Sequence, residues 1–375
     1  MKVLLHITLI LIISLIIGCD KANYEIKTEN GIKHYYNKNT PNDNQLKIEL
    51  SKLLEIRSSS NADSNYFTFP ILNGAKSCVF DKNDNVYFIN AQTNKILKYD
   101  KSTKHISSFG GKGSGPGEFL LPSCFAILND TLYISDAQQQ KVIRYNTNGQ
   151  FIDNIITPKL PMYLYNLKND QFIGQTMSNA MSNKGVELII EIGIYNSKLE
   201  EIRNITKNSS IIDPTKPINP DMVPLRPFAT NGEDIAIAVI DKNKYQIETF
   251  NQDGTKNYII SKAYKRIEYT EAELTKLNTK INNQAKSLDQ KYNIETKYKN
   301  AISTIMFDNF NHLYVVAADT NNSTFKYDIF KNGIFLNSYN LPLPKQTQYD
   351  RIEIIGNKIV KYCENNTLEI YQINK

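Results

Sequence analysis

Residues 78–100, CVFDKNDNVYFINAQTNKILKYD, recur with little change as residues 124–146, CFAILNDTLYISDAQQQKVIRYN. The second copy begins 46 residues after the first, and the two align without a gap. In each copy, short runs of β-branched and aromatic residues alternate with Asn, Asp and Gly, as expected for strands joined by tight turns. A period near ~45 residues with about four strands per unit predicts one blade of a β-propeller.

Weaker copies of this unit follow at residues 167–205, 232–255 and 307–333. Counting all copies, including a last one described below, gives six blades. Seven blades is the alternative if residues 157–225 hold two poorly patterned units. The fold class we expect is all-β, a six-bladed β-propeller of four-stranded antiparallel blades over residues 46–375.

The last copy, residues 351–374, is only three strands long. An incomplete blade leaves an open sheet edge, which soluble proteins usually cover. The chain has one spare strand, LKIELSKLLEIR at residues 46–57, before the first repeat. We therefore expect this N-terminal strand to pair with the C-terminal blade and close the ring.

One insertion, residues 262–298, interrupts the β pattern between blades four and five. From Thr270 to about Tyr292 apolar residues recur at spacings of three and four, which predicts a helix. Thr270 and Glu273 form a capping-box pattern at its start. We favour packing of this helix on the propeller over a lid or docking arm.

The N-terminus has the pattern of a bacterial secretion signal. A short positive start is followed by an apolar run at residues 3–17 and then by Gly18-Cys19. This ending resembles the lipobox of bacterial lipoproteins, which implies a signal peptide at residues 1–18 and a lipid on Cys19. The polar residues 19–45 are then expected to be a solvated tether. We expect the protein in the cell envelope, anchored to a membrane and facing the periplasm or the exterior.

The segment FGGKGSGPGEF, residues 109–119, holds five glycines but does not fit a phosphate-binding loop. A Walker-type loop needs Ser or Thr after its lysine and then a helix. Here Gly113 follows Lys112, and Pro122 prevents a helix just downstream. The segment is better explained as the connection from blade one to blade two, where glycine permits positive φ.

This connection and the strands after it carry a family resemblance. The sequences GKGSGPGEFLLPSCFAI (111–127) and LYISDAQQQKVIRYNTNGQFI (132–152) resemble the NHL-type repeat. The chain over residues 46–375 resembles the six-bladed β-propeller lipoproteins of Bacteroidetes-type bacteria, most closely over residues 75–156. The resemblance implies a fold and an envelope location more than an activity.

Two functions from different classes fit a propeller of this kind. The first is a binding or scaffold protein that recognises a ligand or an envelope partner through one face. The alternative is a calcium-dependent, lactonase-like hydrolase with a metal in the axial channel. Converging carboxylate and amide oxygens from several blades would indicate the hydrolase, and an apolar channel would indicate the binder. Weak metal-ligand candidates are Asp81, Asn90, Asp136 and Asp319, although Asp136 is better explained by hydrogen bonds within its own blade.

Other chemistry is disfavoured by composition. The net charge of +6 is spread along the chain, so a nucleic-acid partner is not expected. Cys78, Cys124 and Cys363 are odd in number, and we expect buried thiols and no disulfide. No His/Cys cluster has zinc spacing and no nucleophile elbow occurs, so we assign no catalytic residue and expect no cofactor other than the alternative calcium.

Overall fold

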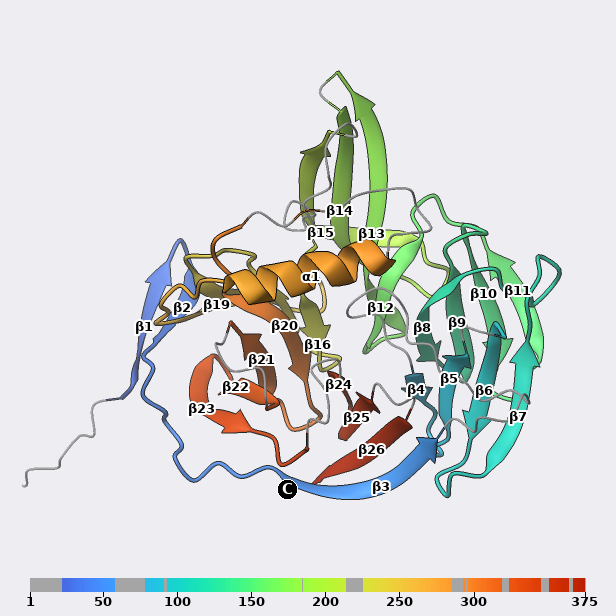
Figure 1. The fold of residues 1–375 in the computed structure, drawn as a ribbon, viewed down its shortest axis with the longest axis horizontal. Coiled ribbons are helices and arrows are strands. Elements are labelled where there is room, and N and C mark those ends of the chain that lie inside the picture. Colours follow the sequence, from blue (N-terminus) through green and yellow to red (C-terminus); the bar gives the residue numbers. More distant parts are fainter. Residues whose placement is uncertain are drawn as a thin grey trace, which may run out of the picture.

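The computed structural model places six β-sheets around a central axis (Figure 1). The chain is a six-bladed β-propeller, almost entirely β, with one short helix among its described residues. Cys19, the signal segment 1–18 and Asp319 lie outside those residues, so the predictions made for them stay predictions. The structure describes residues 22–57, 78–90, 93–183, 185–213, 225–284, 293, 296–318, 324–344, 351–363 and 367–374.

In each blade one strand lies nearest the axis, namely β4, β8, β12, β16, β20 or β24, and the others follow outward (Figure 1). Blade one is β4 (Cys78–Phe80), β5 (Val86–Asn90), β6 (Lys95–Tyr99) and β7 (His105–Gly110), and blade two is β8 (Pro122–Leu128), β9 (Thr131–Asp136), β10 (Lys141–Asn146) and β11 (Phe151–Ile155). Blade three is β12 (Pro161–Leu167), β13 (Gln171–Ser182), β14 (Gly185–Tyr195) and β15 (Glu201–Ile212). Blade four contains β16 (Phe228–Thr230), β17 (Ile235–Ala238), β18 (Tyr245–Phe250) and β19 (Lys256–Lys262). Blade five is β20 (Ile302–Phe307), β21 (Leu313–Ala317), β22 (Lys326–Lys331) and β23 (Ile334–Asn340), and blade six is β24 (Arg351–Ile355), β25 (Lys358–Cys363), β26 (Thr367–Asn374) and β3 (Glu49–Arg57).

The predicted repeat and its predicted closure are confirmed. Cys78 and Cys124 occupy equivalent positions on the inner strands β4 and β8, where their backbones pair with Phe88 and Ser135. The N-terminal strand β3 pairs antiparallel with β26 and completes blade six. The seven-blade alternative is wrong, because residues 161–212 form one blade whose strands β13 to β15 are unusually long and rise beyond the ring (Figure 1).

The apolar core is divided among the junctions between neighbouring blades. The buried clusters each join two adjacent blades, and together they run around the ring. Cys78, Cys124 and Cys363 are buried within these sheets, as predicted. Because each side chain of the core lies between two sheets, burial stabilises the order of the blades as well as each blade.

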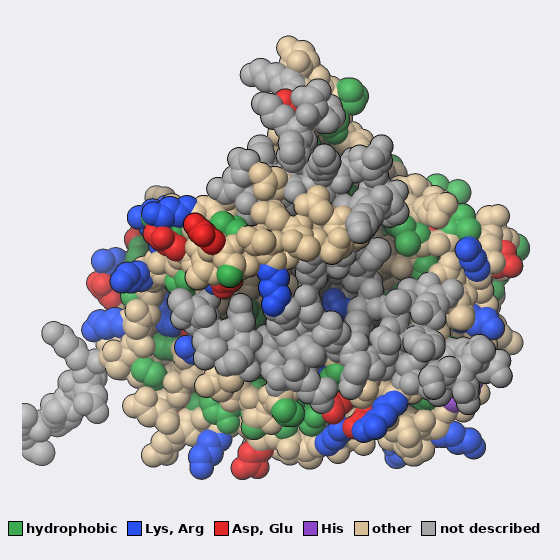
Figure 2. Space-filling view, viewed as in Figure 1, with side chains coloured by type: hydrophobic (Ala, Val, Ile, Leu, Met, Phe, Trp, Pro, Cys, Tyr) green, Lys and Arg blue, Asp and Glu red, His purple; other side chains and the backbone are tan. Residues whose placement is uncertain are grey.

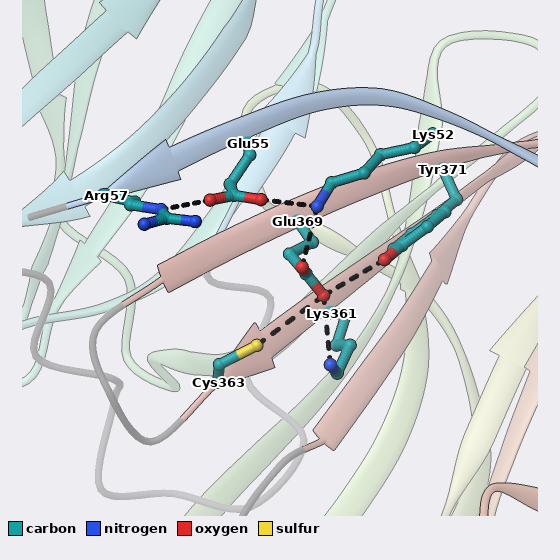
Figure 3. A network of polar contacts seen from close by, with 7 residues as sticks. All are labelled: Lys52, Glu55, Arg57, Lys361, Cys363, Glu369 and Tyr371. Atoms are coloured by element: carbon teal, nitrogen blue, oxygen red, sulfur yellow. Dashed lines mark hydrogen bonds and ion pairs between the residues drawn. The ribbon is translucent and has the colours of Figure 1, made fainter. Parts of the chain in front are cut away.

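A polar network lies inside the closing blade (Figure 3). Lys361 on β25 is fully buried, and its Nζ lies 3.0 Å from Glu369 Oε2 on β26. Lys52 on β3 donates to the other oxygen of Glu369 at 2.8 Å, so that one carboxylate joins three strands. Burial alone would raise the pKa of Glu369, but the two lysines outweigh it and lower the pKa to about 2. The strand that closes the ring is therefore held by charge as well as by backbone hydrogen bonds.

The expected tether over residues 19–45 is wrong for the part that the structure describes. β1 (Tyr24–Glu29) and β2 (Ile32–Asn37) form a hairpin, and β2 pairs in parallel with β19, so blade four has six strands. Asn30 and Gly31 occupy the two-residue turn with φ of 51° and 80°, the conformation of a type I′ turn. His34 hydrogen bonds to Ser261 at 2.8 Å and Tyr35 packs edge-on against Tyr258, so this polar segment is part of the fold.

The predicted helical insertion is confirmed as far as residue 284. Helix α1 (Glu271–Gln284) follows β19 and precedes β20, and it lies across one face of the ring (Figure 1). Its capping box forms as expected, since Thr270 Oγ1 accepts from the Glu273 amide and Glu273 accepts from the Thr270 amide. Leu274 and Leu277 are half-buried, and Lys299 pairs with Glu273 at 2.6 Å. These contacts agree with a helix that packs on the propeller.

No helix among the described residues is long and apolar enough to cross a membrane.

Candidate functional site

A cavity of about 370 Å³ lies on the propeller axis, where the inner strands end. All six blades contribute to its wall, and its size falls in the range of small-ligand sites. Apolar side chains contribute somewhat more of the wall than polar ones. The apolar lining residues are Val79, Phe80, Ile127, Leu167, Ala229, Ile305, Met306, Phe307, Ile354 and Ile355.

The rim of the cavity is formed where each inner strand ends and turns back into the second strand. At all six blade junctions a polar contact joins neighbouring blades at this level. Such a closed ring of contacts fixes the rim before any ligand arrives, which lowers the ordering cost of binding. The six contacts are Lys82 with Asp130 (2.6 Å), Asn166 with the Ile127 carbonyl, the Lys168 amide with the Gly232 carbonyl (2.9 Å), Asn231 with Asn311, the Asn309 amide with the Gly356 carbonyl (3.0 Å), and Lys358 with Asp84 (2.7 Å).

The turns of this rim follow from their Asn and Asp residues. Asn129 and Asp130 have φ of 47° and 57° in a two-residue hairpin turn between β8 and β9. Asp81 and Asp308 hold equivalent turns in blades one and five, each accepting two backbone amides and a tyrosine hydroxyl. Burial would raise the pKa of Asp81, but these hydrogen bonds outweigh it and lower the pKa.

Two aromatic and two charged residues lie on the inner strands of blades three and six, which are opposite one another in the ring. Tyr163 and Tyr165 lie two residues apart on β12, and Arg351 and Glu353 lie two residues apart on β24. Residues two apart on a strand share a face. Tyr165 and Glu353 both line the cavity, and Glu353 accepts a 2.7 Å hydrogen bond from Tyr362. Burial raises the pKa of Tyr165, and the negative charge of Glu353 raises it further.

Electrostatics agree with a cross-channel arrangement of these residues. Burial raises the pKa of Tyr163 to about 12, and the Arg351 charge acts against that rise. The Arg351 guanidinium lies 4.7 Å from the centre of the Tyr362 ring, and the hydroxyl of Tyr362 donates a hydrogen bond to Glu353. Arg351 and Glu353 therefore lie on the same face of β24, and Glu353 is the one of the two that lines the cavity.

The predicted metal-ligand candidates do not line this cavity in the described part of the chain. Asp136 accepts hydrogen bonds from the amides of Leu120 (2.7 Å), Leu121, Gln138 and Gln139. It thereby fastens the end of the glycine-rich connection to blade two, which is a structural role. Asn90 is fully buried at the end of β5 and accepts from the Thr93 amide. Asp81 lies in the rim turn described above, outside the lining.

The glycine-rich segment is the connection between blades that the sequence analysis favours. It links β7 to β8, and its last residue, Phe119, is buried between blades one and two. Gly110 has φ of 77°, and a Cβ there would meet the Phe119 ring at 2.4 Å. The Phe119 amide donates to the Gly111 carbonyl at 2.8 Å, which folds the segment on itself rather than around a phosphate.

The cavity wall differs from what calcium requires. Calcium takes six to eight oxygen ligands, usually with several carboxylates among them. Of the described residues that line the cavity, Glu353 alone carries a carboxylate. No group of three His, Cys, Asp or Glu residues suited to a metal occurs within the described segments. The described wall combines apolar side chains with polar ones such as Asn166, Asn309 and Glu353.

Comparison with known proteins agrees with the fold. A model of a 6-bladed beta-propeller family, DUF5128, matches residues 68–213. The chain is similar to that family over its first three blades. No curated protein sequence matches the chain.

Two solved structures share the architecture. One, assigned as an exported protein of Bacteroides fragilis, is 14% identical with a TM-score of 0.51, over 91% of this chain and 100% of its own. The other, a member of the DUF4221 family from Bacteroides vulgatus, is 11% identical with a TM-score of 0.54, over 87% and 98%. At these identities the likeness shows the fold alone.

Sequence reasoning did not find Glu353 and Tyr165 as cavity residues. They lie in the fragments RIEII and PMYLYNL, which contain no functional motif. The sequence did contain one signal. In RIEII the charged residues Arg351 and Glu353 alternate with isoleucines, which is unusual for a strand in the interior of a fold. Their approach to one another across the ring follows only from the closed fold.

Proposed function

We propose that this chain is a lipid-anchored β-propeller of the bacterial cell envelope that binds a small ligand in its axial cavity. The observation that carries the proposal is a ligand-sized apolar cavity whose rim is bridged at all six blade junctions. Apolar cavities with a few polar groups are the usual form of small-molecule sites. No catalytic step is part of this proposal.

The envelope location is supported by the N-terminal pattern and by the exported structural neighbour. The hairpin β1–β2 limits how far blade four can lie from the membrane. Asn23 is already fixed by hydrogen bonds to Pro41 and Asn42. Only three residues separate it from Cys19, so a lipid on Cys19 holds the hairpin edge of blade four within about 15 Å of the membrane surface. The proposal keeps a Bacteroidetes-type source and an NHL-like repeat, which rest on the sequence at residues 111–127 and 132–152.

The anchor is tested with a Cys19→Ala substitution in the full-length chain. We expect the wild-type protein in the membrane fraction and the variant in the soluble fraction after cell lysis, because one cysteine carries the acyl chains. Cys363→Ala, which changes a buried thiol far from the N-terminus in sequence, is the control. An unchanged distribution of Cys19→Ala would contradict lipid anchoring.

Binding is tested with the neutral fluorescent probe N-phenyl-1-naphthylamine. The chain has no tryptophan, so the background signal is low. Ile127→Trp places a larger side chain in the cavity wall, and Ile106→Trp does so on the exposed outer strand β7. We expect the probe to bind wild type and Ile106→Trp and to lose most of its signal with Ile127→Trp. Equal signals from all three proteins would place the probe elsewhere and reject the cavity as the site.

A further inference from the structure

The charges at the cavity are arranged asymmetrically. Lys168 and Glu353 are the charged residues among its described lining. Lys168 pairs with Glu233 at the rim, and its side chain is 61% exposed, so its charge is neutralised near solvent. Glu353 lies on β24, within an inner strand. Glu353 is therefore the carboxylate that the described lining offers away from the rim.

The groups around Glu353 suit a positively charged ligand. Tyr165 lines the cavity from the opposite blade, and its ring packs edge-on against Phe228 at 5.1 Å, which fixes its orientation. Phe80 and Phe307 add two more rings to the wall. Aromatic faces attract cations, and the attraction grows where water is excluded.

The surroundings of Glu353 also disfavour an anion. Arg351, the nearest cation along β24, stacks on the Tyr362 ring and is absent from the cavity lining. A carboxylate or phosphate in the cavity would meet the charge of Glu353 against apolar walls. Like charges repel strongly in such surroundings.

We infer that the ligand is a compact organic cation, with an ammonium group beside Glu353 and an apolar body against the aliphatic and aromatic wall. This inference rests on the proposed function and names the class of ligand that the cavity takes. Glu353 is the residue that determines specificity, and Tyr165 supplies an aromatic face for the cation.

The test uses three matched probes of nearly equal size: 2-phenylethylammonium, 2-phenylethanol and phenylacetate. Their affinities are measured by titration calorimetry for the full-length folded domain and for Glu353→Gln. Gln retains the size of Glu and an oxygen that accepts from Tyr362. Glu25→Gln is the control, because Glu25 is an exposed carboxylate on the outer strand β1 and does not line the cavity.

We expect wild type to bind the ammonium about tenfold more tightly than the alcohol, as a charge-assisted hydrogen bond predicts, and phenylacetate most weakly. Glu353→Gln is expected to lower the ammonium affinity about tenfold and leave the alcohol unchanged. Glu25→Gln should match wild type for all three probes.

Equal binding of ammonium and alcohol to wild type, or an unchanged ammonium affinity in Glu353→Gln, would overturn the cation assignment. The proposed function would still stand if the neutral naphthylamine probe remained sensitive to Ile127→Trp. If none of the three probes binds, the cation assignment is rejected, and the Ile127→Trp result then decides the proposed function separately.

Discussion

Glu353 and Glu369 differ in surroundings although they lie in one sheet, on the strands β24 and β26 that flank β25 in blade six. Glu369 on β26 is matched by Lys52 and Lys361 and further contacts Tyr371 and Cys363 (Figure 3). Glu353 on β24 lines the axial cavity and accepts from Tyr362. One carboxylate fastens strands together and the other faces a space of ligand size. A perturbed carboxylate is therefore a guide to function only when its partners are considered.

Charged side chains at the surface differ from the buried pair of blade six. On the face that carries α1, the basic side chains are scattered around the periphery with acidic ones among them (Figure 2). Surface pairs of this kind contribute little to stability. The buried pair of blade six differs because Lys361 is fully buried and has no access to water.

The largest effect is expected from Glu369→Gln. This change breaks the ion pair between Glu369 and the buried Lys361, and the loss of one partner of a buried pair typically costs about 3–5 kcal/mol. The free energy of unfolding in urea measures it. Glu55→Gln is the control, because Glu55 also pairs with Lys52 on β3 but its side chain is 24% exposed, and we expect it to cost less than about 1 kcal/mol. Similar losses from both variants would show that burial of Lys361 does not distinguish the two sites.

The second prediction concerns acid. The pKa of Glu369 is lowered to about 2 in the folded chain, so its contribution is complete above the unfolded value near 4.5 and declines as the pH falls toward 2. A shift of this size corresponds to about 3 kcal/mol. The difference in unfolding free energy between wild type and Glu369→Gln should therefore be constant from pH 7 to 5 and shrink below pH 4.5. A difference independent of pH would mean that Glu369 is not ionised in the way the structure indicates.

Much of the fold could be predicted from local signals. The 46-residue repeat fixes the blades, and the three-stranded last copy predicts the pairing of β3 with β26. The added hairpin could also have been found, because Asn30-Gly31 between Ile26 and Ile32 is a strong turn signal. The polar composition of residues 19–45 obscured it, since β1 is largely exposed and β2 alternates only weakly.

The site was harder to predict for a physical reason. The cavity wall takes one or a few residues from each of six inner strands, and ring closure alone brings them together. Glu353 and Tyr165 are separated by about half of the chain and share no motif. Asp136, by contrast, bonds to backbone within a few residues of its own blade, so its role follows from local sequence.

The third prediction separates the two lysines of the closing network. Lys52→Met removes the lysine whose side chain is 40% exposed and leaves the buried Lys361 paired. We expect a loss of about 1 kcal/mol, smaller than for Glu369→Gln, because water replaces part of the interaction. Carboxyl NMR should show the pKa of Glu369 rising from about 2 toward 4.5, since one of its two lysine donors is gone. An unchanged pKa would assign the whole effect to Lys361.

The smallest effect is expected from Glu353→Gln. Tyr362 can still donate to the glutamine oxygen, so the free energy of unfolding should change by less than about 1 kcal/mol. Thermal unfolding should then shift by no more than about 3 °C. A loss as large as that of Glu369→Gln would make Glu353 a structural residue of blade six. A small loss, together with weakened ammonium binding, would separate the carboxylate that holds the ring from the one that recognises the ligand.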